Sequence, residues 1–403
     1  VASPSTLRLL LAMACKFDWE IKQGDVSTAF LCADMEPPIY VTLPPAFNDN
    51  SDIPALRNDP AIEKNSATYH LARKTFPGAP QGTRLFNKKA HKIFIDAGLT
   101  RSKEDFCLYH VPGSGIYLII WVDDFFLFFA EGCRAKAAAI WKYIGEHLDL
   151  GAWDDIGDCL ACDIHRDRSK KVLRIKQTKA IRALIIKSGL SSCNPAPTPV
   201  TTGFVFTKKD CPATDLERSA IASEQKWYRS ILASCIYFSS WTRPDISFAI
   251  SKLSKFMQNP GAIHIAALKR LLRYLHGTAE LGLCYDFSGP PPRAGLYGYY
   301  DASFADDADT RRSTMAYIFF FEGCPISWKS KLHSYVTTST NHSEYCASAK
   351  AAREAKSQKK LLTEIGFEKF ASPVALFSDS QGAIAMNYNP VKRDASKHID
   401  LAD

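Results

Sequence analysis

The sequence has no long apolar run. No uninterrupted apolar stretch exceeds seven residues, whereas a membrane-spanning helix needs about 20, so we expect no contact with a membrane. The N-terminus also lacks the basic, apolar and small-residue succession of a signal peptide. Because the chain begins with Val1 rather than Met and stops at Asp403 without a terminating signal, we expect a piece of a longer polypeptide.

Paired cysteine motifs are nearly absent. The twelve cysteines are scattered singly through apolar surroundings, which is typical of reduced thiols in an intracellular protein. Only Cys159 and Cys162 form a CxxC, with His165 three residues on. A zinc site would need a fourth ligand at a suitable spacing, and none is evident. We therefore favour an interpretation without zinc.

Acidic residues are missing from one segment. The formal net charge of the chain is +8, and the 20 residues from Arg168 to Lys187 hold eight basic and no acidic side chains. This segment, called the basic stripe below, therefore accounts for the whole surplus. A localised basic stripe indicates a polyanionic partner more strongly than a uniformly high isoelectric point does.

Apolar periodicity predicts a mixed α/β chain. A composition that is 46% hydrophobic and 23% charged over 403 residues suits two or three globular domains. The proline-rich segment 288–292 is the clearest boundary, and 44–68 reads as a loop. Helices are predicted at 3–14, 88–97, 134–147, 179–188, 217–241, 244–257, 263–276, 341–365 and after 377; strands are predicted at 19–23, within 116–129 as a pair, and at 172–177, 296–300, 314–321, 325–328 and 374–377.

Two adjacent acids interrupt the most hydrophobic part of the chain. Asp123 and Asp124 separate two β-favouring runs, and like charges among apolar residues are costly unless something neutralises them. Together with Asp25, at the end of another strand, they would supply the oxygen ligands that Mg²⁺ prefers. Two such ions would suit phosphoryl transfer. Taken alone, Asp-Asp is equally compatible with an ordinary exposed turn.

A second set of acids follows the proline boundary. Asp301 and Asp379 each end a predicted strand, Glu344 lies near the start of a long helix, and Asp400 is near the end of the chain. Such acids can converge on a shared metal site for phosphodiester hydrolysis. Individually, each is more often a surface acid or a helix cap. Three further acids are interpreted as solvated loop residues: Asp306, Asp307 and Asp309.

At this point the motifs resemble a known family, the reverse transcriptase and ribonuclease H portion of copia-type LTR retrotransposon polyproteins. QGDVSTAFL, WVDD, TRPDISFAI, LSKFMQNP and RLLRYLHGT look like successive reverse transcriptase motifs. GYYDASFADD, ISWKSK, STNHSEY, LFSDSQGAI and SKHIDL look like ribonuclease H elements in order. The similarity runs from residue 1 to 403, and so many ordered motifs exclude coincidence.

The resemblance implies a fold, a set of domains and a set of residue roles. It implies a right-hand polymerase palm with partial fingers over 1–165, a helical thumb and connection over 166–290, and a ribonuclease H-like mixed β-sheet over 293–403. It implies two Mg²⁺ or Mn²⁺ ions per site. The implied metal ligands are Asp25, Asp123 and Asp124 for the polymerase and Asp301, Glu344 and Asp379 for the nuclease, with Asp400 as a further catalytic acid and His398 as a helper.

The resemblance also implies contacts with substrates. Phe30 matches an aromatic gate against the ribose 2′-OH, and Gln81 and Arg84 match nucleotide-pocket residues. The partners would be an RNA template, a DNA primer, an RNA–DNA hybrid and deoxynucleoside triphosphates. Two groups of cations would contact phosphates: Lys176, Lys179 and Arg182 in the basic stripe, and Lys269, Arg270 and Arg273 beyond it.

The function expected from these residues is RNA-directed DNA polymerisation with a tethered ribonuclease H. The protease and integrase of the same polyprotein would lie upstream, and the location would be a cytoplasmic virus-like particle with a nuclear stage. Trp121 in place of the family's Tyr, and other altered motifs, favour one alternative: a catalytically inactive relic that only binds nucleic acid. An isolated metal-binding or structural domain is a third interpretation.

Overall fold

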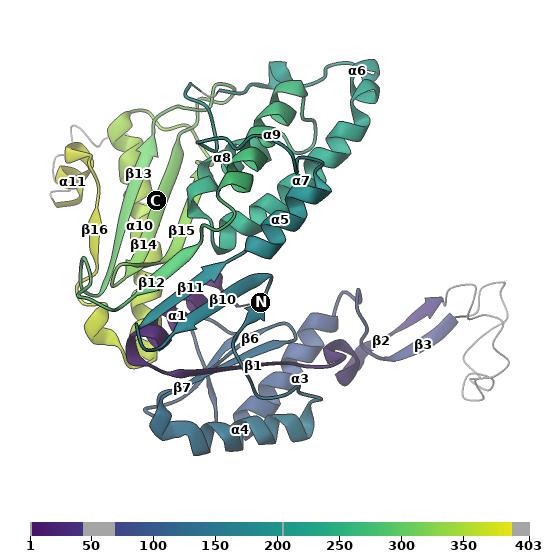
Figure 1. Ribbon diagram of the computed structural model, residues 1–403, viewed down its shortest axis with the longest axis vertical. Helices are drawn as coiled ribbons and strands as arrows, with labels where there is room; N and C mark the ends of the chain where they lie inside the picture. Colours follow the sequence, from purple (N-terminus) through teal and green to yellow (C-terminus); the bar gives the residue numbers. More distant parts are fainter. Residues whose placement is uncertain (1, 43–68, 204, 389–403) are drawn as a thin grey trace. The chain divides into compact units, whose positions relative to one another are not determined.

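The structure is a computed structural model that describes residues 2–42, 69–203 and 205–388 (Figure 1). The predicted loop at 44–68, His398 and Asp400 lie outside these residues. Contacts divide the chain into two compact units: Glu20–Asp155 forms the first, to which Val1–Ala2 is assigned, and Ser3–Trp19 with Ile156–Asp403 forms the second. Within the described ranges, none of the helices combines the length and apolar character needed to cross a bilayer.

The first unit is built on a six-stranded sheet in the order β4-β5-β6-β7-β1-β8. Every residue of the central strands is buried except those at the turn between them, because these strands consist almost wholly of aliphatic and aromatic residues. Phe94 of α3 packs on Phe125 of β7, with ring centroids 5.5 Å apart. The bounds are β1 Glu20–Asp25, β4 Thr100–Arg101, β5 Leu108–Val111, β6 Ile116–Trp121, β7 Asp124–Phe129, β8 Asp154–Asp155, α3 Gly82–Asp96 and α4 Arg134–His147.

A two-stranded extension completes the first unit. Strands β2 (Asp34–Thr42) and β3 (Tyr69–Lys74) pair antiparallel, and the short 3₁₀ helix η1 (Ala29–Cys32) precedes them. The backbone N–H of Thr75 donates to the carbonyl of Ala33, 3.0 Å away, which ties the end of β3 to the residue that follows η1.

The second unit contains a helical bundle and an antiparallel sheet in the order β12-β11-β10-β9. One apolar core joins α5, α7, α8 and α9. The bounds are α5 Thr178–Lys187, α6 Asp215–Ala220, α7 Ala222–Trp241, the 3₁₀ helix η5 Pro244–Ile246, α8 Ser247–Ser254, α9 Ala262–Gly277, β9 Asp158–Cys159, β10 Cys162–Asp167, β11 Val172–Lys176 and β12 Leu283–Asp286.

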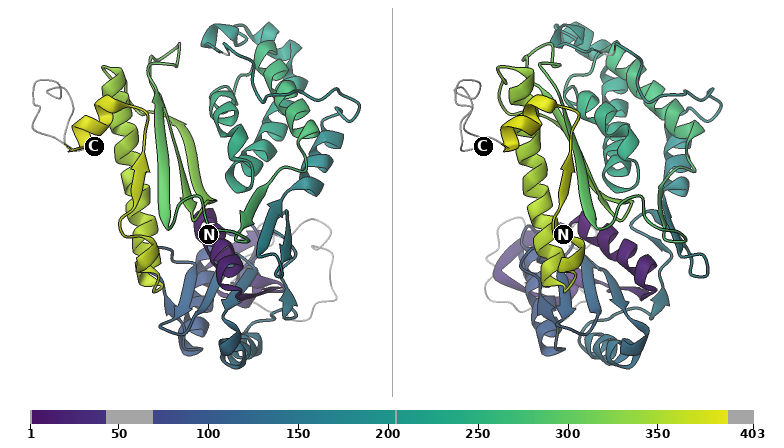
Figure 2. Two further views of the ribbon diagram at one scale, coloured as in Figure 1. Left: turned by 60° about the vertical axis from the view of Figure 1, so that its left-hand side comes forward. Right: turned by 90° about the vertical axis from the view of Figure 1, so that its left-hand side faces the viewer.

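The second unit also carries a mixed sheet in the order β15-β14-β13-β16, in which only β13 and β16 are parallel. Helix α10 lies on one face of this sheet, and helices α7 to α9 lie on the side of the other face (Figure 2). The bounds are β13 Leu296–Ser303, β14 Thr314–Phe321, β15 Cys324–Leu332, β16 Ala375–Phe377, α10 Thr340–Glu364 and α11 Gln381–Tyr388.

The N-terminal helix α1 (Pro4–Phe17) belongs to this second unit. Its residues from Ser5 to Cys15 are all buried, as expected for a helix that is apolar on all sides. The guanidinium of Arg8 donates to the carbonyls of Ile326, Ser240 and Trp241, at 2.7, 2.7 and 3.0 Å. These bonds join the first helix of the chain to β15 and α7, so the compact units follow different limits from the predicted domains.

The predicted mixed α/β class is confirmed, and several element limits are corrected. The helix expected at 88–97 begins at Gly82. The helix expected at 217–241 is two helices, because Ile221 leaves helical geometry with φ −118° and ψ 21°. Strand β13 continues past the expected end to Ser303, because its ladder with β14 extends to Thr314.

Candidate active sites

The first candidate site lies at the end of the β1–β7 ladder. Asp25 and Asp124 are direct partners in its last rung, so their side chains lie on the same face of the sheet. Asp123 lies in the two-residue turn before β7, and its carbonyl accepts from the backbone N–H of Val26 at 2.9 Å. Val122 in this turn has φ 61°, a conformation that is strained for a β-branched residue. The predicted strand pair around Asp123 is therefore correct.

These acids perturb one another. Burial raises the pKa of the Asp124 carboxyl to about 6, and the charges of Asp123 and Asp25 raise it further in the same direction. A cation beside the three carboxylates would remove this cost, since an opposite charge favours the ionised form. The residues present therefore fit a divalent cation.

Residues 149–151 run alongside the end of β1. The backbone N–H of Gly151 donates to the carbonyl of Asp25 at 2.8 Å. A Cβ on Gly151 would lie 3.0 Å from Oδ1 of Asp25 and 3.3 Å from its carbonyl oxygen. Only glycine fits this close approach without pushing on the carboxylate. The sequence interpretation missed Gly151, because no local pattern shows what a glycine faces in space.

The predicted nucleotide-pocket residues gather at the start of α3. Gln81 precedes its first turn and donates from Nε2 to the carbonyl of Pro37 at 3.3 Å. Phe30 of η1 lies against the same turn, with its Cδ1 3.3 Å from the Cβ position of Gly82. Arg84 is exposed in this first turn. The fold thus brings Phe30 next to the Gln81–Gly82 pair across 50 residues of sequence.

The second candidate site lies at the mixed sheet. Asp301 of β13, Glu344 of α10 and Asp379 after β16 each offer a carboxylate oxygen within 4.8 Å of the others. Among the described residues this is the only set of three His, Cys, Asp or Glu side chains that meets this distance. The Asp25, Asp123 and Asp124 set is wider, and the Cys159–Cys162 pair has no third ligand within the described part of the chain.

Glu344 is the buried member of the second set. Its side chain is 4% exposed, and its Oε2 has no hydrogen-bond partner among the described residues. Burial raises its pKa to about 7, and the charge of Asp301 adds to the shift. An orphaned buried oxygen between two other carboxylates is the arrangement that a divalent cation completes. These three residues therefore fit a metal ion.

The basic stripe is paired with acids from elsewhere in the chain. Lys176 and Arg182 contact Glu280 at 3.2 and 2.7 Å, and Lys179 contacts Asp158 and Asp163. Most of these side chains are well exposed. Exposed ion pairs are weak, so a phosphate group can replace the acid. The predicted contact of the stripe with nucleic acid stays a prediction.

The second group of predicted phosphate contacts borders a proline-rich segment. Arg270 donates to the hydroxyl of Thr198 at 2.9 Å, and Arg273 donates to the carbonyl of Asn194 at 2.6 Å. Both bonds tie α9 to residues that follow α5. Lys269 lies on the same helix and is exposed.

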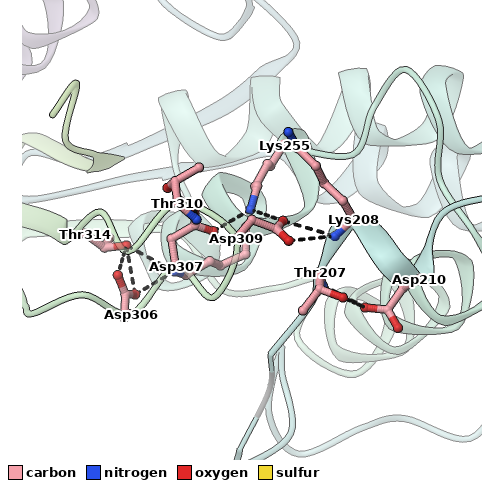
Figure 3. Close-up of polar contacts among 10 residues, drawn as sticks. Thr207, Lys208, Asp210, Lys255, Asp306, Asp307, Asp309, Thr310 and Thr314 are labelled. Carbon is pink, nitrogen blue, oxygen red and sulfur yellow. Dashed lines mark hydrogen bonds and ion pairs between the residues drawn. The ribbon is translucent and has the colours of Figure 1, made fainter. Parts of the chain in front are cut away.

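The interpretation of Asp306, Asp307 and Asp309 as solvated loop acids is wrong. Lys252 of α8 contacts Asp306 at 2.5 Å, and Lys255 contacts both Asp307 and Asp309 (Figure 3). Asp307 is 5% exposed. The two lysines are more than 50 residues distant in sequence, so no local pattern indicated the pairing. These ion pairs fasten the loop between β13 and β14 to the helical bundle.

Comparison with known proteins agrees with the first site. Residues 1–202 match the family described as reverse transcriptase (RNA-dependent DNA polymerase). The chain belongs to this family. The predicted relation to copia-type Pol polyproteins is also confirmed, since the relatives below are of that kind.

Two relatives match the whole chain. The retrovirus-related Pol polyprotein from transposon TNT 1-94 of Nicotiana tabacum is 32% identical over 100% of the chain, which covers 29% of that protein. The corresponding polyprotein from transposon RE2 of Arabidopsis thaliana is 28% identical over 100% of the chain, which covers 26% of that protein. The chain thus spans less than a third of these relatives. Among solved structures, the prototype foamy virus protease-reverse transcriptase aligns over 92% of this chain and 40% of its own, with 11% identity and a TM-score of 0.21.

Proposed function

We propose that this chain is an RNA-directed DNA polymerase with a tethered ribonuclease H that cuts RNA–DNA hybrids. The observation that supports the polymerase is the rung that sets Asp25 against Asp124 in a chain of the reverse transcriptase family. The observation that supports the nuclease is the meeting of three carboxylates within 4.8 Å at the mixed sheet.

Each site would hold Mg²⁺ or Mn²⁺ through its carboxylates. When bound, the ions would lower the pKa of the attacking hydroxyl or water and neutralise charge that develops on the phosphate. Asp25, Asp123 and Asp124 would hold them in the polymerase site, and Asp301, Glu344 and Asp379 in the nuclease site. Asp400 and His398 remain further candidates for the nuclease.

The chain's own residues would select and orient the substrates. Phe30, packed against Gly82, would exclude a ribose 2′-OH, and Gln81 and Arg84 would contact the incoming deoxynucleotide. The exposed cations Lys176, Lys179, Arg182, Lys269, Arg270 and Arg273 would contact the phosphates of template and primer. Such contacts need no sequence readout, which suits an enzyme that copies any template.

The polymerase is tested by extension of a DNA primer on an RNA template with Mg²⁺. The variant Asp123→Asn, Asp124→Asn should lose extension. The matched control is Asp154→Asn, Asp155→Asn, which neutralises two adjacent exposed acids of the same sheet. Equal activity of the wild-type chain and the Asp123, Asp124 variant would refute the polymerase.

The nuclease is tested with a labelled RNA–DNA hybrid. Glu344→Gln should abolish cleavage and leave primer extension intact, whereas Glu364→Gln at the far end of the same helix should change neither. Hybrid binding without extension or cleavage by the wild-type chain would instead identify an inactive nucleic-acid-binding relic.

We further propose that the chain acts within a polyprotein that also carries a protease and an integrase. Its place would be a cytoplasmic particle with a nuclear stage.

A further inference from the structure

A hollow of about 380 Å³ opens beside the nuclease carboxylates. Its floor is the face of the mixed sheet opposite α10, and its wall is the segment 244–248, from η5 and the start of α8. All of its lining residues belong to the second unit. Its volume lies within the range of about 300–1,000 Å³ typical of small-ligand pockets.

The strand register explains why the sheet is hollowed here. Asp301, Ala316 and Ser330 are paired across β13, β14 and β15, so their side chains form one row on one face. The next row on that face is larger and contains Tyr299, Ile318 and Trp328. Because alanine and serine are short, the row that begins at Asp301 forms the bottom of the hollow. One carboxylate thus belongs both to the candidate metal set and to the hollow.

The wall of the hollow is fastened to the sheet on both sides. Lys252, one turn after Phe248 in α8, contacts Asp306 at 2.5 Å and the hydroxyl of Thr314 at 3.1 Å (Figure 3). On the other side, the indole Nε1–H of Trp328 donates to the carbonyl of Ser239 at 2.8 Å. The TRPDISF segment, which the proposed function left without a role, is therefore a fixed part of this site.

The lining suits a flat aromatic ligand with polar edges. Phe248 and Tyr299 are 41% and 45% exposed, which leaves ring surface available for stacking. The Oγ of Ser330 is buried and has no partner among the described residues, so it can bond to a ligand edge. The carboxylates of Asp245 and Asp301 oppose entry of a phosphate. A nucleobase meets these requirements, since every base has a π-face and hydrogen-bonding edges.

We propose that this hollow binds an unpaired nucleobase of the strand that enters the nuclease site, and that Phe248 is a base-stacking residue. The inference rests on the proposed nuclease, because Asp301 is shared. It means that residues before the proline boundary complete the substrate site of the mixed-sheet domain. A hybrid with a short unpaired RNA tail should therefore bind more tightly than a blunt hybrid of the same length.

The test uses the full chain with Glu344→Gln, so that binding is measured with Mg²⁺ but without cleavage. The probe is an RNA–DNA hybrid with a 2-aminopurine base in the unpaired tail, whose fluorescence falls when the base stacks. Phe248→Leu, which keeps an apolar side chain but removes the ring, should weaken binding of the tailed hybrid about tenfold. Phe248→Tyr should restore it. The control is Phe106→Leu, since that exposed ring also lies under a cation, with Arg101 5.0 Å from its centroid.

The outcomes separate the inference from the function on which it rests. Loss confined to the tailed hybrid, with rescue by tyrosine, supports the base site. Equal loss on tailed and blunt hybrids, or no fluorescence change on binding, overturns it. Cleavage of blunt hybrids by the wild-type chain would then leave the nuclease standing, whereas absence of all hybrid cleavage would refute the nuclease itself.

Discussion

Asp25 and Asp124 form the last rung of the β1–β7 ladder. Their proximity depends on register, because a shift of one residue would move either carboxylate to the other face of the sheet. The hydrophobic residues that precede Asp25 and follow Asp124 hold the register: Ile21 pairs with Phe128, and all three first-layer aromatics after Asp124 are buried. The apolar core of the palm sheet thus fixes the charged site at its edge.

The first prediction concerns the free energy of unfolding without metal. The pKa of Asp124 is raised from 3.8 to about 6, so the folded state holds a proton that the unfolded state releases within this range. Stability should therefore fall as the pH rises from 4 to 6. Asp124→Asn should remove this dependence and raise stability above pH 6 by about 1 kcal/mol, after allowance for partial exposure. Urea unfolding in EDTA measures both effects, and a pH-independent wild-type protein would contradict them.

The second prediction concerns Mg²⁺ binding at the mixed sheet. Because the pKa of Glu344 is raised to about 7, a proton competes with the metal below that pH. The midpoint of the Mg²⁺-induced thermal shift should move to lower Mg²⁺ concentration as the pH rises from 6 to 8. In Glu344→Gln that movement should disappear, while Glu364→Gln should behave as the wild type. An unchanged midpoint in the wild-type protein would argue against Glu344 as a ligand.

The third prediction concerns the ion pairs of Lys255. Burial alone would raise the pKa of Asp307, but its hydrogen bonds from Lys255 and Thr310 outweigh this and lower it. The pairs should stabilise the fold above pH 4 and lose this effect as the pH falls further. Lys255→Met should cost about 2 kcal/mol of unfolding free energy. Lys179→Met, in an exposed pair, should leave the free energy almost unchanged.

The fourth prediction concerns Gly151 as a positioning residue for Asp25. Gly151→Ala should displace the carboxylate and lower primer extension about tenfold, since small misplacements at reacting centres are costly. It should also raise the Mg²⁺ concentration needed for half-maximal extension, which a purely structural loss would not do. The control is Gly145→Ala in α4, where an added Cβ meets open space. Partial recovery at high Mg²⁺ is the expected signature.

The fifth prediction concerns the basic stripe. Glu280 neutralises both Lys176 and Arg182, so Glu280→Gln should free two cations for phosphate. Affinity for RNA–DNA hybrids should increase, and log Kd should depend more steeply on log salt, by about one to two units of slope. Neutralising Lys176, Lys179 and Arg182 together should have the opposite effect. If both variants bind as the wild type, the stripe is a solvated face.

Much of this protein was determined by local sequence pattern. The strands around Asp123, the helix from 134 to 147, the strand from 314 to 321 and the carboxylate candidates could all be predicted, because alternation, helical periodicity and acids within apolar runs are short-range signals. The ordered motifs also identified the family before any geometry was known.

Only the tertiary structure decided which charges are neutralised and which residues share a site. The basic stripe has no acid within its own segment, yet Glu280 and Asp158 lie against it, and Lys255 finds Asp307 across 52 residues. In the same way, Phe248 and Asp301 come to line one hollow through strand register and helix packing. Charge pairing and pocket shape depend on distances between residues remote in sequence, and those distances exist only once the chain has folded.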